Sequence, residues 1–483
     1  MSVNVTLIRN ADWVLAWDAE NSRHFYLRHA DVAFENDRIV HVGPGYEGSA
    51  NETIDGRDRM VMPGLVNIHS HLSGGNIDKG IFDETGAPAL YGHALYTHSP
   101  LLRTEEEDAP AAAVSALSEL MQSGVTTVVD ISENYPGRLD LMARSGIRAV
   151  LGSGFRQARW RNVGDHRVEY DWDEQAGWDG LEHALELADS AAAHPSGRIC
   201  GILVPAQADT CTGDLIRTAF TEAEKRDLPF QIHAAQSMVE FYEILRRYGT
   251  SPVQWLDSLG VLGDRTILGH GIYLDRHSWS PLRTDEDMKL LTDSGTTVAH
   301  CPTVFGRTGM TMETAGSYIR EGVHLGVGTD SFPYNMLEEL RNAAVYSRIT
   351  AGDVFDLRTE DLFTAATTGG ARAVGREDIG KLSVGAKADL VLVDTSHPLM
   401  RPLHEPLRNL VYVAAERAVR DVFIDGRQVV ADGRVTTMDY PAAHEEEEAI
   451  QRRALGRVSE IDEKSRSIDE IAPMCFEVRN ETA

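Results

Sequence analysis

The residues best suited to chemistry recur at the ends of short apolar segments of this sequence. The first such segment ends in two histidines separated by one serine. Residues two apart in an extended strand point to the same face, so His69 and His71 can reach one ion from the same side. Four further segments carry or end in the other candidates: His233, His270, His300 and Asp330.

Imidazole groups in this arrangement point to a divalent metal, with zinc as the first expectation. A catalytic zinc site keeps one position open for water, and the metal lowers the pKa of that water to about 7. An acidic side chain beside the ion can then take the proton of the water, and Asp330 in the string GVGTDS is suited to this. The pattern therefore favours a hydrolase. Iron, manganese or cobalt can use the same ligands, so the identity of the metal stays open.

Eight apolar segments, most of them separated by helical stretches, must position these residues. Such alternation is typical of βα units around a parallel sheet, and eight units predict a (β/α)8 barrel whose active site lies at the carboxyl ends of the strands. A doubly wound open sheet is the rival, but no Gly-rich phosphate turn follows the first segment. The segments are 65–69, 126–131, 148–155, 199–207, 230–236, 266–274, 296–302 and 324–331.

The two ends of the chain are expected to form a separate unit. Residues 1–62 and 386–440 contain alternating apolar residues broken by Gly and Asn-Asp turns, which predicts a small β-sandwich domain next to a barrel domain of residues 63–385. Residues 441–483 are predicted to be a helical tail that packs on the barrel or on a neighbouring subunit. The acidic run Glu445–Glu448 in this tail is interpreted as a solvated helix face.

Long insertions between the predicted elements are expected to set the specificity. They cover residues 73–104, 156–172 and 302–312, and the second mixes arginines with aromatic residues. This second insertion is either part of a substrate lid or an irregular surface loop, and the sequence leaves both open. Candidate pocket contacts, with ordinary loop packing as the alternative, are Phe305, Arg307, Phe332 and Tyr334.

Several strings together resemble the motifs of the amidohydrolase superfamily. MPGLVNIHSHL resembles its first-strand motif, and IHAAQ, LGHG, AHCPT and GVGTDS resemble its motifs for strands five to eight, in the same order. GKLSVGAKADLVLVD resembles the usual exit into the small β-domain, so the resemblance covers nearly the whole chain. It implies that His270 lies beside the metal or polarises the scissile group and that His300 lines the substrate pocket. The metal ligands that it implies are His69, His71, His233 and Asp330.

The fourth segment bears on the number of metal ions. Two-metal members of the superfamily carry a bridging lysine or glutamate on strand four, whereas ICGILVPAQADTC contains no lysine. Its nearest acid, Asp209, lies beyond the end of the segment and is interpreted as a turn residue or helix cap. The chain therefore resembles the mononuclear branch, which includes cytosine deaminase-like and s-triazine hydrolase-like members, and one divalent ion is expected.

One departure from that branch bears on the reaction. Deaminases and chlorohydrolases of the branch usually carry His-x-x-Glu on strand five, but here Gln236 follows His233 at that spacing. A glutamine can orient water but does not transfer a proton at ordinary pH. Gln236 is therefore a candidate catalytic residue, and the sequence leaves open whether it takes part in catalysis or only orients the water. The leading hypothesis is hydrolysis of a C–N bond in an amide, urea, carbamate or cyclic amide, in which His270 stabilises the oxyanion and Asp330 protonates the leaving nitrogen.

The alternative hypothesis is deamination or dechlorination of a heteroaromatic ring such as an s-triazine, a pyrimidine or a purine. The strings HAAQSMVEFYEILRRYG and HCPTVFGR also resemble the branch that contains phenylurea and thiocarbamate hydrolases. A third hypothesis, a non-enzymatic assembly protein of the same superfamily, is disfavoured because the set of metal ligands is complete.

The composition of the chain disfavours several classes of binding partner. A formal net charge of −28 disfavours nucleic acid and anionic membranes, and no apolar run is long enough to span a bilayer. The first residues lack the features of a signal peptide, and the four cysteines are widely spaced without a CxxC pair. We therefore expect a cytoplasmic protein with a small-molecule substrate. The resemblance also implies a homo-oligomer, a dimer or higher.

Overall fold

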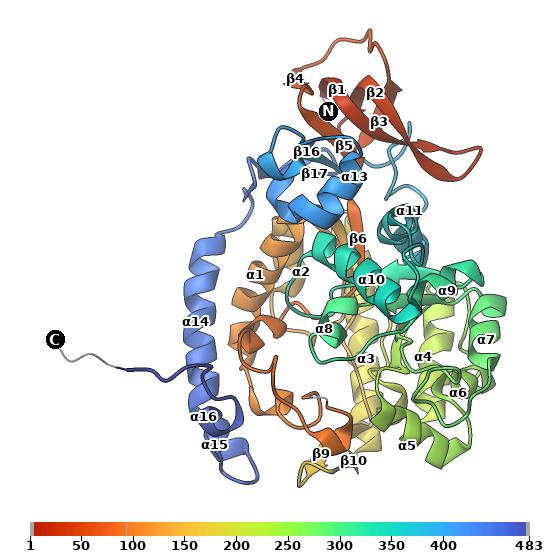
Figure 1. Cartoon of the computed structure of the whole chain (residues 1–483), viewed down its shortest axis with the longest axis vertical. Helices are drawn as coiled ribbons and strands as arrows, with labels where there is room; N and C mark the ends of the chain where they lie inside the picture. Colours follow the sequence, from red (N-terminus) through yellow and green to blue (C-terminus); the bar gives the residue numbers. More distant parts are fainter. Residues whose placement is uncertain (1–3, 93, 480–483) are drawn as a thin grey trace.

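Eight short parallel strands form the centre of the protein (Figure 1), whose structure is a computed structural model that describes residues 4–92 and 94–479. Nearly all residues of these strands are buried, as expected where helices cover a parallel sheet. Each of the eight apolar segments singled out in the sequence contains one strand. The strands are β6 (Leu65–Ser70), β7 (Val125–Asp130), β8 (Arg148–Leu151), β11 (Ile199–Gly201), β12 (Phe230–Ala234), β13 (Thr266–His270), β14 (Thr297–His300) and β15 (His324–Val327).

The eight strands pair as two parallel sheets of four, in the orders β6-β7-β8-β11 and β12-β13-β14-β15. Isolated parallel bridges connect the remaining edges. Leu203, just after β11, pairs with Phe230 in β12, and Ser70 in β6 pairs with Asp330 just after β15. The strands therefore follow one another in a ring, and because all are parallel, their carboxyl ends lie at the same side of it.

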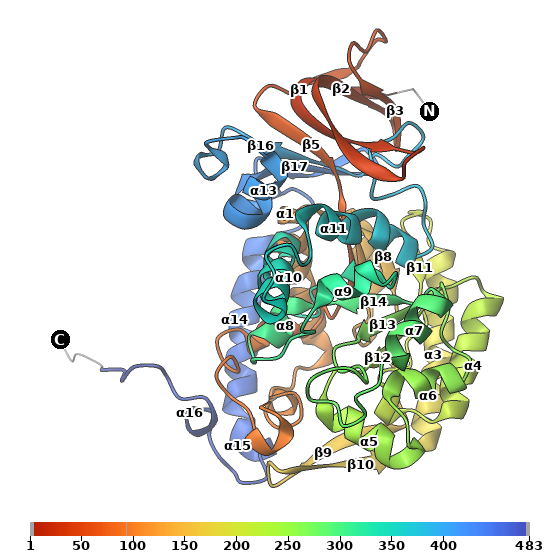
Figure 2. The same ribbon diagram turned by 45° about the vertical axis from the view of Figure 1, so that its right-hand side comes forward.

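Helices alternate with these strands along the chain and cover their outer side (Figure 2). Five of them begin at a side chain that accepts a hydrogen bond from a free backbone N–H of the first turn: Asp173, Thr212, Ser237, Ser251 and Asn335. In the described part of the chain, no helix is both long and apolar enough to cross a bilayer. The helices are α1 (Ala109–Gln122), α2 (Arg138–Ser145), α3 (Glu174–Ala192), α4 (Gly213–Lys225), α5 (Met238–Tyr248), α6 (Pro252–Ser258), α7 (Glu286–Ser294), α8 (Pro302–Gly306), α9 (Ala315–Arg320), α10 (Met336–Ala351), α11 (Thr359–Thr364) and α12 (Gly370–Ala373).

Both ends of the chain contribute to a second, mixed sheet of nine strands, at the top of Figure 1. The two ends meet where β5 pairs antiparallel with β16. The rings of Phe34 in β2 and Phe423 in β17 lie 5.6 Å apart, although three strands separate β2 from β17 in the sheet order. The sheet therefore curls over its own apolar core. Its strands are β1 (Val5–Asp18), β2 (Arg23–Glu35), β3 (Arg38–Gly43), β4 (Glu52–Asp55), β5 (Arg59–Pro63), β16 (Leu390–Asp394), β17 (Val419–Ile424), β18 (Arg427–Ala431) and β19 (Arg434–Val435).

A buried ion-pair network fastens this sheet to the ring of strands. Arg148, the first residue of β8, is 2% exposed, and its Nε donates to Oδ2 of Asp389 at 3.0 Å. Its Nη2 donates to Oδ1 of Asp425 at 2.6 Å. β6 begins directly after β5, the strand of the nine-stranded sheet that precedes it, and runs away from that sheet. The carboxyl ends of the parallel strands therefore lie at the far end of the molecule from the nine-stranded sheet (Figure 1).

The insertion at 156–172 forms a β-hairpin at that far end, in place of the irregular loop considered from the sequence. Its strands are β9 (Ala158–Val163) and β10 (Arg167–Trp172). Trp160 Nε1 and Tyr170 OH donate to Oδ2 of Asp209 at 2.9 and 2.8 Å. Asp209 lies in the 3-10 turn η5 (Ala208–Thr210), in agreement with its interpretation as a turn residue, and its fully buried carboxyl group also anchors the hairpin.

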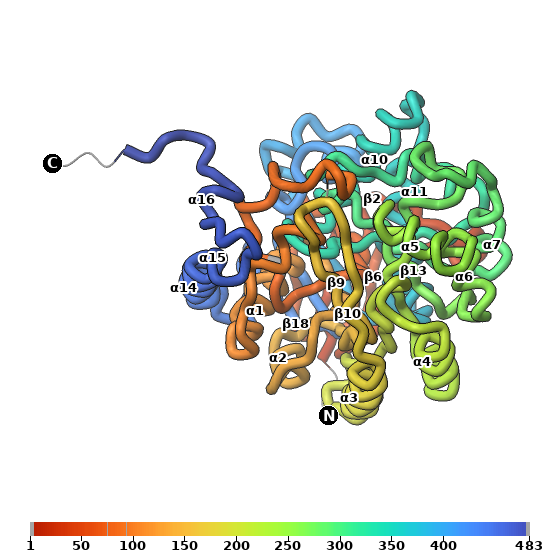
Figure 3. Tube along the Cα trace, turned by 90° about the horizontal axis from the view of Figure 1, so that it is seen from below, coloured from red at the N-terminus to blue at the C-terminus, as the bar shows by residue number. Residues whose placement is uncertain are grey.

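The C-terminal tail contains three helices, and it supports the insertion at 73–104 (Figure 3). Ile450 and Ala454 of the tail form an apolar cluster with Ile77 and Phe82 of the insertion. Glu447 is buried, so the prediction that the whole acidic run is solvated was wrong. The tail comprises α14 (Tyr440–Gly456), α15 (Val458–Ile461) and α16 (Ile468–Ile471), and the insertion contains the short 3-10 turns η1 (Gly75–Asp78), η2 (Pro88–Leu90) and η3 (Ser99–Leu101).

Replacing Ile450 with alanine should loosen this contact. Ile450 is 1% exposed, and truncation of such a side chain costs about 2–5 kcal/mol. We expect a lower thermal midpoint and faster proteolysis within residues 73–104. The matched control is Glu446→Ala on the exposed side of the same helix, which should change neither. Equal protease sensitivity of the insertion in both variants would contradict the supporting role of α14.

Candidate metal centre

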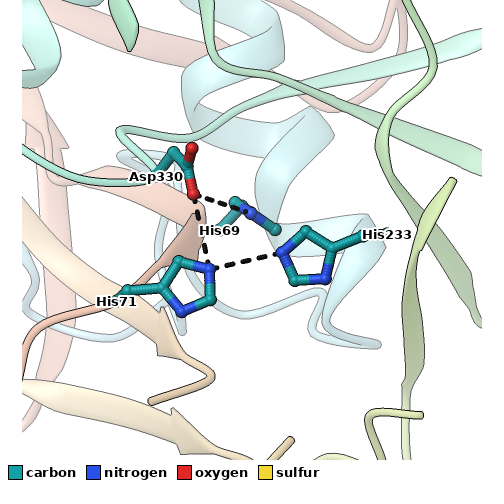
Figure 4. Close-up of side chains that lie close together, drawn as sticks. All are labelled: His69, His71, His233 and Asp330. Atoms are coloured by element: carbon teal, nitrogen blue, oxygen red, sulfur yellow. Dashed lines mark hydrogen bonds and ion pairs between the residues drawn. The ribbon is translucent and has the colours of Figure 1, made fainter. Parts of the chain in front are cut away.

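Four side chains from three segments far apart in the sequence converge at the carboxyl end of the ring of strands (Figure 4). His69 is the last residue but one of β6, His71 follows that strand, His233 lies in β12 and Asp330 follows β15. One ligand atom from each lies within 4.8 Å of the other three. Oδ1 of Asp330 is 3.3 Å from Nε2 of His69 and 3.4 Å from Nε2 of His71. Nε2 of His71 is 3.3 Å from Nε2 of His233.

Backbone pairing sets the relative positions of His69, His71 and Asp330. The backbone N–H of His71 donates to the carbonyl of Asp330 at 2.7 Å, and that of Asp330 donates to the carbonyl of His69 at 2.9 Å. This approach requires glycine at 328, because a Cβ there would lie 2.7 Å from the Cβ of His69. A Cβ at Gly269 would lie 2.8 Å from Cε1 of the same imidazole. The glycines in LGHG and GVGTD thus make room for His69.

Hydrogen bonds orient two of the imidazole rings. Nδ1 of His69 lies 3.0 Å from Oε1 of Gln231, and Nδ1 of His233 lies 2.6 Å from the carbonyl oxygen of Ala206. Both acceptors hold the proton on Nδ1, so Nε2 of each ring is left as a lone-pair donor toward the centre of the cluster. Gln231 was not predicted from the sequence, although its position two residues before His233 places it on the same face of β12.

The electrostatics of the cluster favour the ligand forms of these groups. Burial lowers the pKa of His71 and, more strongly, that of His233, so both imidazoles are neutral. Burial opposes the charge of Asp330, but His270, His69 and His71 outweigh it and hold the pKa of this carboxyl far below its usual range. A neutral imidazole and an ionised carboxylate are the forms that bind a metal ion.

The residues present fit one divalent cation. Nε2 of His69 is buried and has no hydrogen-bond partner among the described residues, which suits an atom that faces an ion. Three imidazole nitrogens and one carboxylate oxygen match a catalytic zinc-type donor set. A second group, His69, His270 and Cys301, lies within the same 4.8 Å limit, but it shares His69 with the first. Burial also raises the pKa of the Cys301 thiol, which disfavours the thiolate that a metal requires.

A cavity of about 290 Å³ opens beside the cluster and is lined by His71, His233 and Asp330. Of the other residues predicted for the site, His270, Gln236, Phe305, Arg307 and Phe332 line it. Further lining residues that the sequence did not reveal include Asp78, Phe82, Leu95, Ser99, Trp160 and Gln207. A larger hollow of about 780 Å³ beside α2 and α3 contains none of the predicted residues.

Two predicted substrate contacts do not reach this cavity. His300 is 5% exposed and is not in the cavity wall, and burial lowers its pKa to about 4. Tyr334 is fully buried, and its hydroxyl donates to the carbonyl oxygen of His71. Tyr334 therefore supports a predicted ligand from behind. His300 lies within the AHCPT motif, and Tyr334 lies just after the GVGTDS motif. Both side chains are buried in the packing around the site instead of lining the cavity.

Gln236 is held at the cavity wall by its backbone. The carboxylate of Glu240 accepts hydrogen bonds from the backbone N–H groups of Ala235 and Gln236 at 2.8 and 2.9 Å, and burial raises its pKa to about 8. The side-chain Nε2 of Gln236 is buried but has no hydrogen-bond partner among the described residues. The same holds for Nδ1 of His270. Two unpaired polar atoms, one of them an amide donor, thus belong to residues of the cavity wall.

Replacing His71 with alanine should remove bound metal, because the remaining three ligands leave an incomplete site. Elemental analysis of purified protein should show about one ion per chain in the wild type and almost none in the variant. His183→Ala, a change at an exposed histidine of α3, is the control and should keep full metal content. Full metal content in His71→Ala would refute the ligand assignment.

Gln231→Met should weaken metal binding without removing any ligand. The change leaves Nδ1 of His69 without its acceptor, and loss of such a partner typically costs about 10–100-fold in metal affinity. Competition with a chromogenic chelator measures this affinity. Gln231→Glu keeps an acceptor at that position and should bind metal more tightly than Gln231→Met. Equal affinities for the two variants would exclude an orienting role.

Comparison with known proteins agrees with this site. Residues 60–429 match the model of the amidohydrolase family. A 5-methylthioadenosine/S-adenosylhomocysteine deaminase from Natronomonas pharaonis is 29% identical over 435 residues, which cover 89% of this chain and 95% of the relative. A protein of the same description from Desulforudis audaxviator is 30% identical over 437 residues, with the same coverage of both chains.

Solved structures are similar over almost the full length. A zinc-bound adenosine deaminase from Xanthomonas campestris matches with a TM-score of 0.78 and 26% identity, over 93% of this chain and 98% of that one. A zinc complex of atrazine chlorohydrolase from Arthrobacter aurescens matches with a TM-score of 0.79, over 92% of this chain and 100% of that one; at 22% identity it bears on the fold alone. By its sequence, the chain belongs to the amidohydrolase family, whose members are hydrolases that act on C–N bonds.

Proposed function

We propose that this protein is a mononuclear zinc hydrolase that displaces an amino group, or a comparable leaving group, from a carbon atom of a nitrogen heteroaromatic ring. The observation that carries the proposal is the Nε2 donor of Gln236, a residue of the cavity wall that also contains His233 and Asp330. This donor has no hydrogen-bond partner in the part of the chain that the structure describes. A buried amide donor without a partner costs free energy unless a ligand supplies the acceptor. A ring nitrogen next to the reacting carbon is such an acceptor.

The cavity wall suits a flat substrate. Phe82, Trp160, Phe305 and Phe332 contribute aromatic surface to a space of about 290 Å³. Aromatic side chains favour the offset or edge contacts that a planar ring also makes. The relatives and the zinc-bound structure of 26% identity named above are described as deaminases of 5-methylthioadenosine, S-adenosylhomocysteine or adenosine, which all contain such a ring. Ring substitution therefore has more support than the amide or urea hydrolysis that leads from the sequence alone.

The chain's residues divide the reaction between them. His69, His71, His233 and Asp330 would hold a zinc ion, which would lower the pKa of water and so make a nucleophile available at neutral pH. The oxygen of that water forms a bond with the ring carbon, while Asp330 takes the proton of the water. Gln236 donates a hydrogen bond to the ring nitrogen on which negative charge collects. The bond from carbon to the leaving group then breaks, and Asp330 returns the proton to that group, which departs as ammonia when it is an amino group.

We further propose that the ring of eight strands is a closed (β/α)8 barrel of residues 63–385. Residues 1–62 and 386–440 then form the small β-domain, with residues 441–483 as the tail. The cyclic strand order and the bridges at both sheet edges support this proposal. The full-length structural similarity to two hydrolases agrees with it.

Hydrolysis of an amide, urea or carbamate is the second candidate. It is favoured by Gln236 itself, because a glutamine does not deliver a proton to a ring nitrogen. A screen of the zinc-loaded protein separates the two candidates. It offers aminated and chlorinated triazines, pyrimidines and purines beside acyclic amides, ureas and carbamates, and product masses are read directly. Turnover of the acyclic compounds alone would overturn the ring proposal.

Replacing Gln236 with leucine should remove the donor to the ring nitrogen and keep the side-chain size. Loss of one such donor typically lowers kcat by about 100–1000-fold. Gln236→Glu restores a donor only in its protonated form, so its activity on an aminated ring should exceed that of the leucine variant and fall as pH rises. Both variants should keep full metal content. Undiminished kcat in Gln236→Leu would rule out the assigned role.

A further inference from the structure

A carboxyl group that the proposed reaction does not use lies in the wall of the same cavity. Asp78 ends η1 in the insertion that follows β6, and it lines the cavity together with His71, Gln236 and His270. Its side chain makes no hydrogen bond and no ion pair within the described residues. A carboxyl group without a partner in a cavity wall is stabilised when a ligand supplies a hydrogen-bond donor or a positive charge.

Arg307 also lines the cavity, but it forms no ion pair with Asp78 among the described residues. Nε of Arg307 donates to Oδ1 of Asp83 at 2.5 Å, and its Nη1 donates to the carbonyl oxygen of Phe332 at 2.7 Å. Its guanidinium group also lies 4.0 Å above the ring of Phe332. Arg307 is therefore already engaged. Burial raises the pKa of Asp78 to about 7, and the charge of Arg307 opposes this only in part.

The surroundings of Asp78 attract positive charge. Phe82, Trp160 and Phe305 line the same cavity, and the faces of aromatic rings attract cations. The chain as a whole carries a formal charge of −28, which draws cations and repels anions. An ammonium group placed here would meet a carboxylate and aromatic faces at once.

We propose that Asp78 determines the specificity of this cavity, and that the substrate carries a basic nitrogen on a side chain remote from the reacting ring carbon. The ammonium form of that nitrogen pairs with the carboxylate of Asp78, while the ring faces Gln236 and the four ligands. The proposal rests on the proposed function for the reacting end of the substrate and adds the chemistry of its other end.

The test uses two chloro-s-triazines that differ in one atom of a side chain. One carries an aminoethylamino group, which is cationic at neutral pH, and the other carries a propylamino group of the same length. The zinc-loaded wild type should favour the cationic compound by about 10–100-fold in kcat/KM, the range of a hydrogen bond between charged groups. Asp78→Asn should abolish this preference, so that the two compounds are turned over with similar kcat/KM.

A control variant and a binding measurement make the outcomes decisive. Glu84→Gln removes one exposed negative charge from the same insertion and should keep the preference. Calorimetry with the two hydroxylated products measures binding without catalysis, so it tests Asp78 even if neither compound is hydrolysed. Failure of turnover alone would overturn the proposed function. Equal product affinities in wild type and Asp78→Asn, or loss of the preference in Glu84→Gln, would overturn the role of Asp78.

Discussion

The pairing of the first parallel strand with the segment after the last one is the interaction on which the site depends. Two backbone hydrogen bonds join Asp330 to His69 and His71 across more than half of the sequence. A third contact, from the side-chain Nδ2 of Asn67 to Oγ1 of Thr329 at 2.9 Å, lies directly beneath them. Because the residues that pair are also the predicted ligands, the connection that brings β6 and β15 together is the same one that assembles the cluster.

This arrangement explains which features could be predicted from the sequence. Residues two apart share a face of a strand, and carboxyl ends of parallel strands share a side, so the meeting of His69, His71 and His233 followed from pattern alone. The eight apolar segments could also be recognised in the sequence, because strands that are buried on both faces are continuously apolar. Both inferences need only the local period of the chain and the direction of its strands.

Features that depend on side-chain direction or on long insertions were not predictable in this way. His300 and Tyr334 occupy expected places in the chain, yet they point into packing because neighbouring segments fill the space around them. The anchoring role of Asp209 was not predictable because its partners, Trp160 and Tyr170, come from a hairpin whose pairing no local pattern reveals. Asp78 reaches the cavity only because the insertion packs on a helix more than 350 residues later, through Ile450 and Ala454.

The exchange of a carboxylate for an amide at position 236 changes how negative charge on the substrate is stabilised. A glutamate would have to be protonated to act as a donor, and it would stand near Asp330 and add repulsion to a cluster that already holds one carboxylate. Gln236 donates at every pH and adds no charge. Its backbone N–H donates to the buried carboxyl group of Glu240, which holds this segment at the cavity wall before substrate binds. In the proposed reaction, proton transfer then falls to Asp330 alone, which suits electron-poor rings that accept a nucleophile without prior protonation.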